Sequence, residues 1–210
     1  MQEHYTQIKI GNISTSEIEI KDIIKAWLAI SAAFGIALSD SLLLSAFYTK
    51  FIIASLTVGI GFLLHELGHK IVAQRYGCFA EFRSFDTMLL LAILMSFFGF
   101  IFAAPGAVMI HGHVTKKRYG IISAAGPIIN LALALLFLSL VFVFPTGLIN
   151  SAAYYGFLVN TWLALFNMIP FWQFDGSKIL KWNKIVYGLM VAAAISFMVL
   201  QNFMALPAIK

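Results

Sequence analysis

The residues with the clearest capacity for chemistry lie together in the sequence His65-Glu66-Leu67-Gly68-His69. His65 and His69 are four residues apart, so on a helix they share one face, where two imidazoles can bind one zinc ion. Glu66 follows the first histidine, where its carboxylate can reach a water molecule at the metal. The pattern predicts a zinc-binding helix in which Glu66 is the general base.

The surroundings of this motif strengthen the prediction. Residues 51–64 are apolar or small throughout. An ionisable group at the depth of a bilayer costs roughly 2.5–3.5 kcal/mol on insertion scales. In a soluble helix the same motif could arise by chance, with a surface glutamate and two partly buried histidines. In an apolar helix three such groups need a partner, and a bound metal supplies one.

Asp175 is the candidate for a third metal ligand. It follows Pro170, which would end a helix, and it precedes Gly176, which suits a tight turn that aims the carboxylate inward. Two histidines and one carboxylate leave a fourth position for water, which is the arrangement of catalytic zinc sites. The alternative is an interfacial carboxylate paired with Lys178, three residues further along a helix.

The composition is that of a polytopic membrane protein. The 210 residues are 61% hydrophobic and 11% charged, against about 45–50% and about 25% in soluble domains. The net charge of +5 is modest, and no basic run is longer than the one at residues 116–118, so we expect the bilayer rather than nucleic acid as partner. The single cysteine, Cys78, excludes an intramolecular disulfide and is interpreted as a small hydrophobic residue just past a helix end.

We predict one integral-membrane domain over residues 1–210, with a catalytic core at 51–184. Residues 1–22 alternate in polarity and predict a β-hairpin. Lys70 and Arg75 are interpreted as marking the aqueous end of the histidine-bearing span. The expected spans cover, approximately, residues 24–48, which Asp40 interrupts near its far end, and residues 51–77, 119–144, 152–171 and 185–206.

Residues 88–110 decide the topology. If they cross the bilayer, the fourteen lysines and arginines divide seven against seven; if they dip in and return, the division is twelve against two. The positive-inside rule favours the second arrangement. We therefore predict an all-α fold of about five to six transmembrane helices, with a re-entrant segment and a small membrane-associated β element around 103–114. The amino terminus and the zinc-proximal side would be cytoplasmic in a multi-pass protein of the cell membrane.

Three motifs together resemble the site-2 proteases, a family of intramembrane zinc metalloproteases. They are the His65–His69 motif, the helix start Ala125-Gly126-Pro127 with Asn130, and Asn167-x-x-Pro170 leading to Asp175-Gly176.

The resemblance implies one zinc ion per chain, held by His65, His69 and Asp175, with Glu66 as catalytic base. It also implies that Asn167, and more weakly Asn130, binds the substrate. For Asn130 an interhelical hydrogen bond is an equal alternative.

The resemblance further implies that the substrate is a transmembrane helix, cleaved in or near the membrane. Such a segment must unwind before its peptide bond is attacked, and an exposed strand at residues 107–110 could hold it by β-addition. The alternative is that residues 107–110 simply pack. The chain departs from the family pattern at Gln173, often proline, and at Ser177, often glycine. These departures affect the local loop and not the ligands.

Two other functions and one other protease family are the alternatives to this interpretation. A catalytically silent scaffold or chaperone of the same fold would not need Glu66. A metal or ion transporter would need more intramembrane carboxylates along a path. Prenyl-protein proteases share the histidine motif but have a glutamate as third ligand. His111 and His113 could form a second metal site or a pH sensor, although we expect them to be interfacial polar residues of a basic loop.

Overall fold

The computed structural model describes residues 7–11, 13–39, 44–101 and 105–204. The chain forms two compact units: residues 1–55 with 69–113, and residues 56–68 with 114–210. Four parts of the sequence predictions lie outside the described residues: Asp40, the first residues of the hairpin, the start of the β element at 103–104, and the end of the last span.

The first unit begins with a β-hairpin and a capped helix. Strands β1 (Gln7–Ile10) and β2 (Ile13–Ser16) pair antiparallel, which confirms the predicted hairpin. The hairpin ends earlier than predicted, because helix α1 (Glu17–Ala37) starts directly after Ser16. The Ser16 hydroxyl accepts the backbone N–H of Glu19 at 3.2 Å, which caps the helix.

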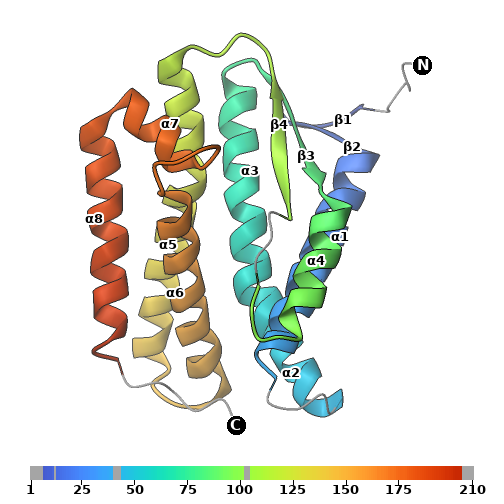
Figure 1. Ribbon diagram of the computed structural model, residues 1–210, viewed down its shortest axis with the longest axis vertical. Helices are drawn as coiled ribbons and strands as arrows, with labels where there is room; N and C mark the ends of the chain where they lie inside the picture. The colour runs from blue at the N-terminus through green and yellow to red at the C-terminus, as the bar shows by residue number, and fades with distance from the viewer. Residues whose placement is uncertain (1–6, 12, 40–43, 102–104, 205–210) are drawn as a thin grey trace. The chain divides into compact units, whose positions relative to one another are not determined.

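The continuous helical segment that carries the histidines begins at Leu44, earlier than the predicted start of that span near residue 51. Helix α2 (Leu44–Ala54), the π-helical turn η1 (Ser55–Gly59) and helix α3 (Ile60–Arg75) follow one another without a break (Figure 1). The predicted boundary near residues 48–51 is therefore wrong, since helix continues through it. One π turn interrupts the hydrogen-bond ladder and ends at Gly59, six residues before His65; such turns often accompany functional sites.

Residues 79–111 form a short β ribbon around a helix. Strands β3 (Phe79–Ser84) and β4 (Gly106–His111) pair antiparallel, with Phe82 opposite Val108. Between them lies the short apolar helix α4 (Asp86–Ser96), which packs on α1. A helical piece followed by a strand was predicted here and is confirmed, and the re-entry of residues 88–110 stays a prediction. Strand β3 was not predicted.

The second unit is a helical bundle that includes the first half of α3. Helices α5 (Lys116–Val143), α6 (Gly147–Asn167) and α8 (Lys184–Gln201) run beside one another, and the short helix α7 (Asp175–Trp182) packs on α5 and α8 (Figure 1). A buried cluster of Ala134, Leu138 and Phe157 joins α5 to α6. A helix at this place was expected only in the alternative that pairs Asp175 with Lys178.

Three helices of the described chain are long and apolar enough to cross a membrane. They are Phe47–Arg75, Lys116–Val143 and Lys184–Gln201. The chain is thus mostly helical, with the features of a membrane protein. The number of five full spans stays a prediction.

Candidate metal centre

Helix α3 presents the first two candidate ligands on successive turns. His65 and His69 are both buried, and Glu66 between them is half-buried. Gly68 lies where α3 meets α5: a Cβ there would stand 2.4 Å from Ile129 Cδ1 and 3.3 Å from the Ala125 carbonyl oxygen. Glycine in the motif therefore lets the ligand helix approach its neighbour closely.

Asp175 is brought to His65 by helix α7. It is the first residue of that helix and is buried. Its Oδ2 lies 3.4 Å from His65 Nε2, and its Oδ1 lies 3.5 Å from Lys178 Nζ. The two interpretations of Asp175 as a ligand and as the partner of Lys178 are therefore compatible, since each uses a different oxygen.

Gly176 serves close packing and not the tight turn that was predicted. It lies within α7, and a Cβ at this position would stand 2.1 Å from the Met168 carbonyl oxygen. A backbone oxygen cannot move aside as a flexible side chain can. The absence of a side chain is what allows Asp175 to be carried against the end of α6.

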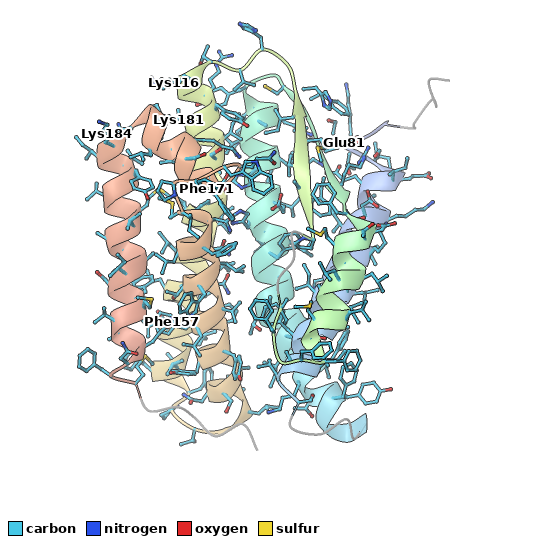
Figure 2. The ribbon with its side chains drawn as sticks, in the orientation of Figure 1. Glu81, Lys116, Phe157, Phe171, Lys181 and Lys184 are labelled. Atoms are coloured by element: carbon cyan, nitrogen blue, oxygen red, sulfur yellow. The ribbon has the colours of Figure 1, made fainter. Side chains whose placement is uncertain are left out.

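The loop before Asp175 is held by Ser177, one of the two departures from the family pattern. Its hydroxyl lies 3.1 Å from the Trp172 carbonyl oxygen and 3.0 Å from that of Phe174. Trp172 has a positive φ of 47°, which is uncommon for a bulky residue. The neighbouring Phe171 is exposed (Figure 2).

The three side chains are suited to one metal ion. One ligand atom each from His65, His69 and Asp175 lies within 4.8 Å of the others, and all three residues are buried. Two imidazoles and a carboxylate are ligands that zinc accepts, and three protein ligands are typical of a catalytic site. The residues that the sequence singled out from two distant motifs are brought together.

Asn130 fixes the orientation of His65. Its Oδ1 lies 2.6 Å from His65 Nδ1, while its Nδ2 donates to the Gly61 carbonyl oxygen at 3.2 Å and to Asn160 Oδ1 at 3.0 Å. Because both amide hydrogens are used, the oxygen faces the imidazole and Nδ1 carries the proton. Nε2 is the ring nitrogen that faces Asp175, and it is therefore the one available to a metal ion.

For Asn130 the contacts are those of the interhelical alternative, whereas its expected role in substrate binding stays a prediction. Its side chain is fully buried among α3, α5 and α6, which is the interhelical alternative. Asn160 was not singled out in the sequence, yet it is equally buried and donates to the Gly156 carbonyl oxygen at 2.9 Å. Its signal was available, because a strongly polar side chain inside an apolar helix needs a specific partner.

Asn167, His111 and His113 are the remaining residues that the sequence singled out. Asn167 is half-buried as the last residue of α6, and its Nδ2 donates to the Leu163 carbonyl oxygen at 2.9 Å. His111 ends strand β4, and both it and His113 are exposed. Within the described ranges, the only grouping of three potential metal ligands is that of His65, His69 and Asp175.

Comparison with known proteins agrees with this centre. The chain is 39% identical to the candidate zinc metalloprotease MJ0611 of Methanocaldococcus jannaschii, over 90% of this chain and 96% of that protein. It is 35% identical to the candidate zinc metalloprotease Rip2 of Mycolicibacterium smegmatis, over 54% of this chain and 50% of that protein.

A third relative, the zinc metalloprotease MJ0392 of M. jannaschii, is 28% identical over 58% of this chain and 31% of its own length. The chain thus spans nearly all of the first relative, about half of the second and about a third of the last. No family model and no solved structure gives a significant match. The extent of the first match, together with the buried ligand set, shows that the chain belongs to the site-2 protease-like family of zinc metalloproteases.

Proposed function

We propose that this protein is an intramembrane zinc endopeptidase that hydrolyses a peptide bond in or near a transmembrane helix of a membrane-bound substrate. The observation that carries the proposal is the buried group of His65, His69 and Asp175, whose ligand atoms lie within 4.8 Å of one another. A catalytic role explains why Glu66 follows the first ligand. A silent scaffold would need neither the base nor an oriented His65.

Each residue has a defined part in hydrolysis. Zinc, when bound, would supply Lewis-acid activation of the water and of the scissile carbonyl. Glu66 would accept a proton from the attacking water and later deliver it to the leaving amine. Asn130 would hold His65 in the tautomer that leaves Nε2 as ligand. We assign Asn167, at the end of α6, to hydrogen bonding with the unwound substrate backbone, which an amide can serve as donor and acceptor.

Strand β4 is the proposed docking site for the unwound segment. A helical peptide bond is shielded by its own hydrogen bonds, so the substrate must be extended before it is cut. In the part of the chain that the structure describes, β3 and β4 form a two-stranded sheet with β4 at one edge. An extended peptide could add to residues 107–110 as a further strand. Proline at Val108 would remove a backbone donor and should impair cleavage, whereas threonine there should not.

We further propose that residues 88–110 enter the membrane and return, so that twelve of the fourteen basic residues face the cytoplasm with the zinc-proximal side. The presence of both a short helix and a strand in this stretch supports the proposal. An accessibility tag at Gly112 should be reached only from the cytoplasmic side. Labelling of that tag from outside intact cells would overturn this topology.

The function is tested by metal content and cleavage together. Purified wild-type protein should hold about one zinc per chain by elemental analysis, and Asp175→Ala should lose it. Glu66→Gln should keep the zinc yet fail to cleave a membrane-bound reporter with a transmembrane segment. Full biological effect of Glu66→Gln would favour the scaffold, and zinc retained by Asp175→Ala would remove Asp175 from the ligand set.

A further inference from the structure

Glu19 is a fully buried carboxylate outside the metal centre. Its Oε2 accepts hydrogen bonds from the Thr15 hydroxyl at 2.7 Å and from Lys70 Nζ at 2.5 Å, and its Oε1 accepts the backbone N–H of Phe82 at 2.8 Å. A buried charge is tolerated only when it is paired and hydrogen-bonded in this way. Glu19 thereby connects three segments of the first unit: the end of β2, helix α3 and strand β3.

Lys70, the residue after His69, is also buried. This corrects the interpretation of Lys70 as a marker of the aqueous edge. Gln74 lies one turn further along the same side of α3. Its Nε2 donates to the Ser14 and Ala80 carbonyl oxygens, both at 2.9 Å, and its Oε1 accepts the Ser14 N–H at 3.0 Å. Both side chains therefore fasten the ligand helix to β2 and β3, Lys70 through Glu19 and Gln74 directly.

A second buried carboxylate, that of Glu81 in β3 (labelled in Figure 2), is connected to Glu19 through Ser16. It accepts from the Ser16 hydroxyl at 3.3 Å and forms an ion pair with Arg83. Strand β3 is in register with β4, so that Glu81 lies opposite Met109. A shift of β3 along α3 would therefore carry β4 with it.

We propose that Glu19 and Lys70 are positioning residues that set the register of β4, and hence of a substrate strand added to it, relative to His69. This inference rests on the proposed proteolytic function and on β4 as its docking strand. An apolar contact could join α3 to β3 with similar strength, but it is non-directional. The hydrogen bond from Phe82 N–H to Glu19 fixes one backbone position of β3 against α1, and the Lys70–Glu19 pair ties that point to the helix that carries the ligand.

The test measures where the substrate is cut, by mass spectrometry of the products. Conservative variants Glu19→Asp and Lys70→Arg keep the charges but change their reach, so they should fold. We expect cleavage to spread to neighbouring peptide bonds and KM to rise about threefold to tenfold while zinc content stays unchanged. The exposed pair of Lys25 and Asp86, joined at 2.5 Å in the same unit, is the matched control. Lys25→Gln and Asp86→Asn should leave the cleavage position unchanged.

Hydrogen exchange gives a second readout that does not need activity. In Glu19→Gln the amides of β3 and β4, that of Phe82 above all, should exchange faster than in the wild type and in the Lys25 variant. A single unchanged cleavage position in Glu19→Asp and Lys70→Arg, or unchanged exchange in β3 and β4, would overturn the positioning role. Absence of cleavage by zinc-loaded wild type would instead overturn the proposed function, and exchange would then decide whether Glu19 holds the ribbon.

Discussion

Helix α3 is fixed by two buried polar networks of opposite character. At His65 Nδ1, in the second unit, the contacts are neutral amides: Asn130 bonds the imidazole, the Gly61 carbonyl and Asn160. Past His69, in the first unit, the contacts are ionic, between Lys70 and Glu19. Helix α3 is thus held by neutral hydrogen bonds at the candidate metal ligand His65 and by an ion pair next to the β3–β4 ribbon.

The difference has a physical reason. A charged group behind His65 would change the imidazole's affinity for protons and for metal, whereas an amide orients the ring and adds no charge. The β3–β4 ribbon supplies none of the three candidate metal ligands, so a charge next to it does not alter one. A charge-assisted hydrogen bond, as between Lys70 and Glu19, holds the ribbon to α3 more strongly than a neutral hydrogen bond would. Single variants can perturb either the ionic network or the neutral one without touching the other.

The largest effect should follow from breaking the ionic network on one side only. Lys70→Met leaves the Glu19 carboxylate buried without its cation, which should lower the free energy of unfolding by about 3–5 kcal/mol. The double variant Glu19→Leu with Lys70→Met should lose much less, because no buried charge remains. Unfolding in mixed detergent micelles measures both. Equal losses in the single and double variants would mean that the pair is not coupled.

Breaking the neutral network should act on metal affinity and much less on the fold. Asn130→Leu removes the partner of His65 Nδ1, and loss of such a partner typically weakens zinc binding by about 10- to 100-fold. Competition with a chelator would measure the change. Asn160→Leu is the matched control one step further from the ligand, and it should have a smaller effect. A larger effect for Asn160 would place the orienting role elsewhere.

Gly61, whose carbonyl oxygen accepts a hydrogen bond from Asn130, allows the neutral network to be disturbed by one added methyl group. A Cβ at Gly61 would stand 2.4 Å from Asn160 Oδ1, so Gly61→Ala should displace the amide pair and cost about 1–3 kcal/mol of stability. Gly188→Ala is the control, because nothing lies within 4 Å of a Cβ there. Thermal unfolding followed by tryptophan fluorescence would compare the two. A neutral Gly61→Ala would show that the amides can move without loss.

The smallest effect should come from the exposed ion pair of the first unit. Lys25 and Asp86 have 44% and 72% of their side chains exposed. Water and salt screen such a pair, so Asp86→Asn should shift the thermal midpoint far less than Lys70→Met does. Any shift should fade as salt is raised. A salt-independent shift as large as that of Lys70→Met would remove the distinction between buried and exposed pairs.

Several elements could not be predicted from the sequence because their signals are non-local. Ile18 and Ile20 alternate with polar residues as in a strand, yet the Ser16 cap and two acidic residues in the first turn start α1 at Glu17. Residues 79–84 have no partner strand nearby in sequence, since β4 follows after helix α4. Helix α7 is only eight residues long.

The sequence by itself determined the chemistry. The four-residue spacing of His65 and His69, the carboxylate of Asp175 and the apolar composition were sufficient to predict a membrane-type zinc site, because ligand type and helical period are local properties. Only the tertiary structure decided how these groups are held. Asn130 of α5 meets Asn160 of α6 over 30 residues of sequence, and Glu19 reaches Lys70 over 51. A buried polar group must find a partner wherever the fold places one, and spacing along the chain does not record where that is.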